Sequence, residues 1–139
     1  MITAVGMWTL TKAVESFVFD FPGKAVLAVA FASAGSLIIF FAVAMFAKAR
    51  TTVNPTDPSK AQTLVTTGLY RVSRNPMYLA MAFLLAGWGM FLGSALNLLL
   101  LGGFIHAMNT LQIKPEETAL EEIFGDAYLD YCRRTRRWI

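Results

Sequence analysis

Residues 75–113 read NPMYLAMAFLLAGWGMFLGSALNLLLLGGFIHAMNTLQI and contain no Asp, Glu, Lys or Arg. As one helix this stretch would extend about 58 Å, close to twice the ~30 Å hydrocarbon core of a bilayer. Gly93, Ser94 and Asn97 interrupt it near the middle, where a turn is expected. The stretch therefore predicts a helical hairpin of two short membrane spans, residues 77–93 and 96–113.

A second charge-free stretch, residues 25–47, lies between Lys24 and Lys48 and would cross the bilayer as a helix of about 35 Å. Of the 139 residues, 56% are hydrophobic and 15% are charged, whereas soluble domains average roughly 25% charged residues. This composition, with a single cysteine, disfavours an ordinary cytosolic globule and excludes a disordered chain and a disulfide scaffold. We therefore expect a single all-α integral membrane domain over residues 1–139.

The first 22 residues are less hydrophobic than the two long stretches. Their apolar side chains recur at helical spacing up to the break at Pro22-Gly23, namely Met7, Leu10, Val14, Phe17, Val18 and Phe21. The pattern predicts a helix over 1–22 that packs on the bundle, either at the interface or as an extra span. The protein thus has three spans, or four if residues 1–22 also cross.

Basic residues are distributed unevenly between the two sides of this topology. Lys12 and Lys24 lie on one side, and ten lie on the other: Lys48, Arg50, Lys60, Arg71, Arg74, Lys114, Arg133, Arg134, Arg136 and Arg137. By the positive-inside rule, the 48–76 loop and the 114–139 tail are cytosolic. We expect a prokaryotic plasma (inner) membrane protein, with no nucleic-acid partner.

The loop ends in Arg74-Asn75-Pro76-Met77-Tyr78, where Pro76 fits the first turn of a helix. The N–H groups of a helix N-terminus at the membrane surface favour anionic ligands. The alternative is a proline cap, with Arg74 snorkelling and Tyr70 and Tyr78 as interfacial aromatics.

The tail begins KPEETALEEIFGDAYLDY and ends in a run of arginines. Glu116 and Glu117 lie in the first turn after Pro115, where they complement the helix dipole. The tail is either part of a site or an amphipathic anchor whose arginines contact anionic lipid. His106 and Asn109, within the hairpin, indicate either a site or an interhelical hydrogen bond.

Taken together, the loop and the tail resemble the isoprenylcysteine carboxyl methyltransferase and phospholipid methyltransferase superfamily of membrane enzymes. The family pattern is G-x-Y, then R-H-P-x-Y before a helical hairpin, then E-E-x-x-L-x-x-x-F-G-x-x-Y-x-x-Y and basic residues. The matching residues here lie within 60–139: Gly68, Tyr70, Arg74-Asn75-Pro76-Met77-Tyr78, Glu116-Glu117, Leu120, Phe124-Gly125, Tyr128 and Tyr131.

The resemblance implies an S-adenosyl-L-methionine cofactor, with S-adenosyl-L-homocysteine as product and no metal. The tail helix would close a cytosolic pocket. Carried over by position, the cofactor residues are Gln62, Thr63, Leu64, Val65, Tyr70, Asn75, Pro76, Met77, Tyr78, Glu116 and Glu117, and the catalytic residues are Arg74 and Glu117. Asn75 stands where the family has His, and Ile113 stands where relatives that act on prenylcysteine have Arg. The Asn-Pro-Met-Tyr version resembles the phospholipid N-methyltransferase branch, and both departures argue against a prenylated cysteine as acceptor.

Methyl transfer from a sulfonium is an in-line displacement in which the enzyme mainly aligns the reactants. Glu117 suits the cofactor's ammonium, and Asn75 with the amides near Pro76 suits its carboxylate. Arg74 would hold an anionic acceptor, and Glu116 or Glu117 would act as base for an amine. The predicted acceptor is a lipid-like or isoprenoid-like amphiphile reached from the bilayer at the cytosolic interface.

Two other functions remain compatible with the sequence. One is an NADPH-dependent membrane reductase related to sterol reductases, although no glycine-rich dinucleotide fingerprint is present. The other is a non-catalytic small membrane subunit. A transporter is disfavoured because neither long apolar stretch holds a carboxylate.

A membrane core this small favours a homo-oligomer that encloses the substrate.

Overall fold

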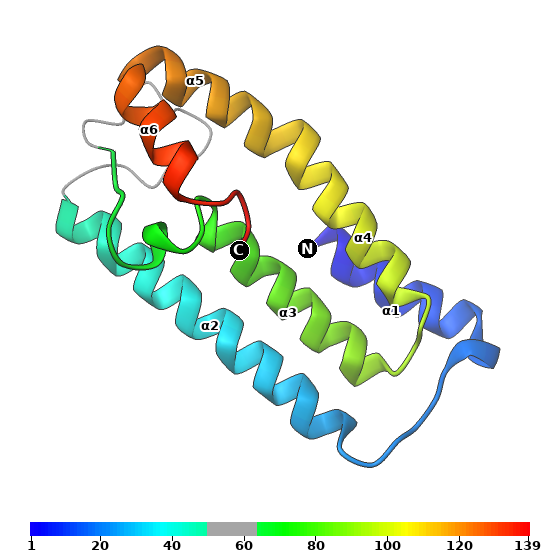
Figure 1. Cartoon of the computed structure of the whole chain (residues 1–139). Helices are drawn as coiled ribbons and strands as arrows, with labels where there is room; N and C mark the ends of the chain where they lie inside the picture. Colours follow the sequence, from blue (N-terminus) through cyan, green and yellow to red (C-terminus); the bar gives the residue numbers. More distant parts are fainter. Residues whose placement is uncertain (50–63) are drawn as a thin grey trace. The chain divides into compact units, whose positions relative to one another are not determined.

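The computed structural model describes residues 1–49 and 64–139, and the regular elements among them are all helical (Figure 1). The predicted all-α class is therefore confirmed for this part of the chain. The described residues divide into two compact units, 1–37 with 80–107 and 38–79 with 108–139. Two of the predicted cofactor residues, Gln62 and Thr63, lie outside the described residues.

Helix α2 (Lys24–Ala49) confirms the helix predicted over 25–47. Its segment Lys24–Met45 is the one helix among the described residues that is long and apolar enough to cross a membrane by itself. Large apolar side chains of α2, such as Val26, Val29 and Phe40, are exposed. An apolar helix with exposed apolar side chains suits contact with lipid.

The predicted hairpin turn is confirmed. Helix α3 (Pro76–Leu92) ends before Gly93, which has a φ of 73°, and α4 (Asn97–Ala107) begins after the turn. The α3 helix is apolar but shorter than a full span. The second leg, predicted over 96–113, is helical from Asn97 to Ile113, and its last part is a π-helical segment, η4 (Met108–Ile113), that follows α4 directly. The number of membrane crossings stays a prediction.

Helix α1 (Ile2–Ala13) packs against α4 in the first unit (Figure 1). The Trp88 indole donates to the Ala4 carbonyl at 3.0 Å, and the Asn97 amide donates to the Thr11 hydroxyl at 3.2 Å. These bonds confirm that the N-terminal helix packs on its neighbours.

The helix does not extend to Phe21 as its periodicity predicts. After Ala13 comes the 3-10 turn η1 (Glu15–Phe17), whose Phe17 is 49% exposed. The chain then bonds to the hairpin turn, with Phe19 N donating to the Gly93 carbonyl and Ala95 N to the Phe17 carbonyl. Backbone pairing with the turn replaces the helical hydrogen bonds there.

Two glycines allow α2 and α3 to approach closely within the first unit. A Cβ at Gly35 would lie 2.9 Å from the Ala80 carbonyl oxygen, and a Cβ at Gly87 would lie 2.9 Å from the Ala28 carbonyl oxygen. Small residues at such contacts are typical of helix pairs in membranes, where close backbone approach increases van der Waals contact.

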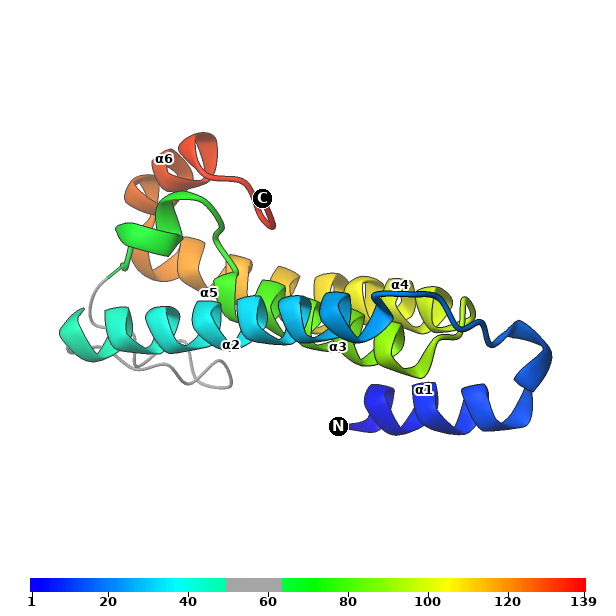
Figure 2. The same ribbon diagram turned by 90° about the horizontal axis from the view of Figure 1, so that it is seen from below.

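The second unit contains the remaining helical elements: the 3-10 turn η3 (Gly68–Arg71), α5 (Lys114–Phe124) and α6 (Asp126–Arg134). Gly125, with a φ of 51°, breaks the tail helix as its sequence predicts. Figure 2 shows α6 folded back beside α5, with η3 next to α6. A buried cluster of Ala42 from α2, Tyr70 from η3, and Tyr128 and Tyr131 from α6 forms the core here, and Leu120 and Phe124 of α5 pack against it.

We expect Gly35→Ala and Gly87→Ala to destabilise the protein by about 1–3 kcal/mol, because the added methyl group meets backbone atoms. Unfolding in mixed detergent micelles measures this change. Gly102→Ala is the matched control, since nothing lies within 4 Å of a Cβ there. Equal behaviour of all three variants would contradict the close approach of α2 and α3.

Candidate functional site

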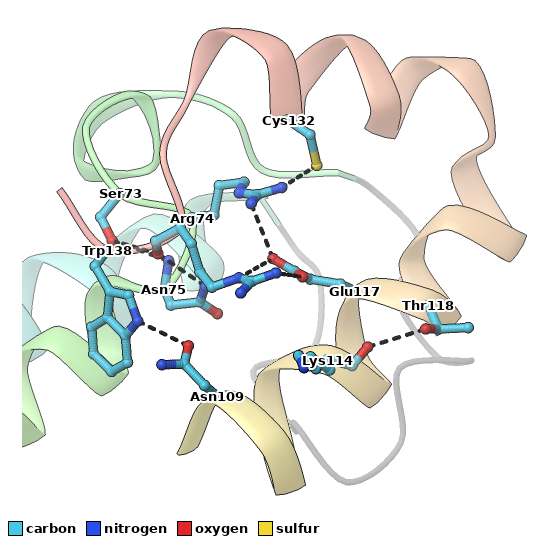
Figure 3. Close-up of polar contacts among 10 residues, drawn as sticks. Ser73, Arg74, Asn75, Asn109, Lys114, Glu117, Thr118, Cys132 and Trp138 are labelled. Atoms are coloured by element: carbon cyan, nitrogen blue, oxygen red, sulfur yellow. Dashed lines mark hydrogen bonds and ion pairs between the residues drawn. The ribbon is translucent and has the colours of Figure 1, made fainter. Parts of the chain in front are cut away.

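The carboxylate of Glu117, in the first turn of α5, binds two arginines from distant parts of the sequence. Oε1 lies 3.1 Å from Arg74 Nη2 and accepts from Arg137 Nε at 3.0 Å, and Oε2 accepts from Arg137 Nη2 at 2.6 Å. The Arg74 and Glu117 side chains are 14% and 18% exposed, and Arg137 is 37% exposed. Figure 3 shows Arg74 between Glu117 and Cys132. The geometry defines a partly buried cluster with one negative and two positive charges.

Arg74 also donates through Nη1 to the Cys132 Sγ. Its Nε is buried and has no hydrogen-bond partner among the residues that the structure describes. Burying a donor without a partner costs about 1–3 kcal/mol. This nitrogen is therefore a donor suited to an anionic group.

The C-terminal segment, residues 135–138, lies along the residues before α3. Ser73 and Arg136 form a parallel β-bridge, and Arg74 N donates to the Arg136 carbonyl at 3.0 Å. The Asn75 Nδ2 donates to the Arg137 carbonyl at 3.0 Å. Beyond these contacts, the Trp138 indole donates to Asn109 Oδ1 at 3.0 Å (Figure 3). Asn109, for which the sequence left two roles open, thus contacts the C-terminal segment.

Glu116 has different partners from its neighbour Glu117. The Tyr78 hydroxyl and the Gln112 Nε2 each donate to Glu116 Oε1 at 2.6 Å. Burial raises the pKa of Glu116 above its ordinary value of 4.5, while the two hydrogen bonds act in the opposite direction. Glu116 is therefore a stronger base than an exposed glutamate.

A cluster of tyrosines lies beside these carboxylates in the same unit. The Tyr131 hydroxyl donates to the Tyr70 carbonyl at 2.6 Å, and the rings of Tyr128 and Tyr131 are 6.2 Å apart. Burial raises the pKa of Tyr70, Tyr128 and Tyr131, so the phenols stay neutral at physiological pH. These aromatic side chains anchor η3 to α6.

The structure separates the predicted site residues into three groups. Arg74 and Glu117 pair in the charged cluster, Asn75 donates to the main-chain carbonyl of Arg137, and Tyr78 contacts Glu116. The apolar members belong to the tyrosine cluster: Leu64, Val65, Tyr70 and Met77. Pro76 is fully buried at the start of α3.

Three residues of the site, Ser73, Gln112 and Arg137, were not predicted from the sequence. Arg137 lies in a run of arginines that could equally contact anionic lipid. Nothing in the sequence of the run distinguishes Arg137 from its neighbours. Ser73 and Gln112 carry no pattern that marks them. Only the three-dimensional pairing identifies these residues.

A pocket of about 230 Å³ lies elsewhere in this unit. It is lined by Thr66, Arg71, Tyr131, Arg134 and Thr135. None of the predicted cofactor residues lines it, so the predicted cofactor pocket stays a prediction.

Among the described residues, one helix is long and apolar enough to cross a membrane, and the second unit carries two adjacent carboxylates, one of them paired with arginines. The model of the phospholipid methyltransferase family matches residues 24–127, well over half of the chain. The chain belongs to the phospholipid methyltransferase family. The predicted resemblance is thus confirmed, and membership implies a membrane-associated methyltransferase enzyme.

A relative from Haemophilus influenzae (strain ATCC 51907 / DSM 11121 / KW20 / Rd), described as an uncharacterized protein, is 43% identical over 63 residues. The similar region is 45% of this chain and the whole length of the relative. No solved structure matches the chain.

Glu117→Gln should destabilise the protein by about 1–3 kcal/mol, because it leaves the partly buried Arg74 and Arg137 without a negative partner. Thermal unfolding in detergent measures the loss. Glu122→Gln, on the exposed face of α5, should leave the midpoint unchanged. A Glu117→Gln variant as stable as the wild type would show that the cluster contributes nothing to the fold.

Proposed function

We propose that this protein transfers a methyl group from S-adenosyl-L-methionine to the amine of a lipid-like, membrane-embedded acceptor at the cytosolic interface. The observation that carries the proposal is the ion pair between Arg74 and Glu117, with the Asn75 amide held next to it on the Arg137 carbonyl. Family membership supports the reaction class. The proposed orientation, with the 114–139 tail in the cytosol of a prokaryotic inner membrane, rests on the positive-inside rule.

The residues of the charged cluster fit the polar ends of this cofactor. Glu117 is an acceptor for the cofactor's ammonium, and the Asn75 amide and the buried Arg74 Nε are donors for its carboxylate. The N–H groups at the start of α3 add further donors. When bound, S-adenosylmethionine supplies a methyl group: a bond forms from the acceptor to the methyl carbon, the carbon–sulfur bond breaks, and S-adenosylhomocysteine leaves.

Glu116 is the proposed general base for an amine acceptor. An ammonium group must lose a proton before its nitrogen can attack, and a carboxylate with a raised pKa accepts that proton more readily. Both hydrogen bonds described above reach Oε1, so within the described part of the chain Oε2 is left for the acceptor. Tyr78 and Gln112 orient the carboxylate for this task.

The acceptor class follows from the same residues. A carboxylate acceptor is already ionised and needs no base, whereas an amine acceptor does. The base supplied by Glu116, with Asn75 and Ile113 in place of the family's His and Arg, favours an amine. A lipid acceptor would approach from the bilayer while the cofactor enters from the cytosol.

Calorimetry on the detergent-purified protein should detect saturable binding of S-adenosylhomocysteine. We expect Glu117→Ala to weaken this binding by about tenfold or more, because the ligand's ammonium loses a charged acceptor. Glu122→Ala is the matched control and should bind as the wild type does. Binding of NADPH instead would favour the reductase, and binding of neither ligand by the folded protein would favour a non-catalytic subunit.

The rate of methyl transfer to an amine lipid should fall as the pH decreases through the pKa of Glu116. Protonation removes the base, and since burial raises this pKa, the decline should begin at a higher pH than an exposed glutamate would give. Glu116→Gln should lower kcat by about a hundredfold at neutral pH.

The comparison of the two pH profiles isolates Glu116 from the acceptor's own titration. The ratio of the wild-type rate to the Glu116→Gln rate should approach one at low pH, where the wild-type base is protonated. A ratio that is independent of pH would show that Glu116 is not the base. Glu121→Gln, at an exposed position on the same helix, should follow the wild-type profile.

A further inference from the structure

The C-terminal segment binds the same polar groups that the proposed function assigns to the cofactor. Arg137 bonds both oxygens of Glu117, and its carbonyl accepts from the Asn75 amide. A carboxylate with both oxygens bound in this forked geometry has few acceptor positions left for an ammonium. The segment therefore competes for the site.

The charges in the cluster also disfavour a cationic ligand while Arg137 is present. Glu117 contributes one negative charge, and Arg74 and Arg137 contribute two positive charges. A sulfonium cofactor carries a further positive sulfur, which is repelled by a cluster of net positive charge. If the ligand's ammonium replaces the Arg137 guanidinium, Glu117 again has two cationic partners, Arg74 and the ammonium. The number of positive charges around Glu117 is then unchanged.

We propose that residues 136–138 form a displaceable strap that covers Glu117 and Asn75 in the resting protein and leaves when the cofactor binds. This proposal rests on the proposed function, because it takes the Glu117–Asn75 cluster to be the cofactor site. The strap acts as an intramolecular ligand, and its release sets the apparent affinity for the cofactor.

The strap is held in a way that permits release. Its contacts are side-chain bonds and a single β-bridge, and Arg137 is 37% exposed. Helix α6 ends at Arg134, and Thr135, which is buried and extended, is the last residue before the strap. A rotation after Thr135 would release the strap without unfolding α6 or its tyrosine contacts. Loops that open and close in this way commonly control ligand entry.

The affinity of a ligand for a site that is open only part of the time is reduced by the open fraction. Weakening the strap should therefore tighten binding. We expect Arg137→Gln to lower the Kd for S-adenosylhomocysteine by about tenfold. Arg133→Gln is the matched control, because Arg133 lies in the same basic run but pairs with the exposed Asp130, and its Kd should equal that of the wild type.

Hydrogen exchange measured by mass spectrometry on the full-length protein gives a second, independent readout. Saturating S-adenosylhomocysteine should speed exchange in the peptide that covers residues 135–139, because the strap leaves its partners. A segment that forms a fixed wall of the site would instead become more protected.

Weaker ligand binding by Arg137→Gln, or protection of 135–139 on binding, overturns the strap and leaves the proposed function intact. Absence of binding by the wild type and by Arg137→Gln overturns both proposals. Tighter binding by the variant together with faster exchange in the wild type supports the strap.

Discussion

The carboxylate of Glu117 joins three segments that are far apart in the sequence: the residues before α3, the start of α5 and the C-terminal segment. Arg74, before α3, and Arg137, in the C-terminal segment, would each otherwise carry an unbalanced charge in a partly buried position. Removing one partner from such a group is costly because the remaining charge is poorly solvated. Glu117 therefore supplies the negative charge that holds the Arg74 guanidinium next to the start of α3.

Two glutamates that are adjacent in the sequence have different environments because successive residues of a helix point about 100° apart. Glu116 contacts Tyr78 and Gln112, whereas Glu117 contacts the arginines. One carboxylate is thus held by neutral donors with its pKa raised, and the other is held by cations. Such a difference allows neighbouring carboxylates to take separate roles, as in the proposed proton acceptance by Glu116 and ligand binding by Glu117.

Much of the fold could be predicted from the sequence. The charge-free stretches predict α2 and the hairpin, Pro76 marks the start of α3, and Gly125 marks the break in the tail. The family resemblance predicts that Arg74 and Glu117 belong to one site. The contacts of the C-terminal segment after α6 could not be predicted from the sequence, because no sequence feature distinguishes Arg137 from the other arginines of the basic run.

The end of α1 at Ala13 was also missed, because its apolar periodicity continues past the point where the backbone pairs with the hairpin turn. Periodicity reports which faces are apolar, whereas the competing backbone hydrogen bonds depend on a segment distant in the sequence. The π geometry of η4 has no comparable pattern in its residues. These features arise from tertiary context.

An experimental structure of the protein with bound S-adenosylhomocysteine would show whether Glu117 is part of a cofactor site. We expect the ligand's amino group to lie within hydrogen-bonding distance of the Glu117 carboxylate, with Arg137 moved away from it. A ligand bound instead in the pocket lined by Thr66, Arg71 and Arg134, with Glu117 still held by both arginines, would show that Glu117 has no part in cofactor binding.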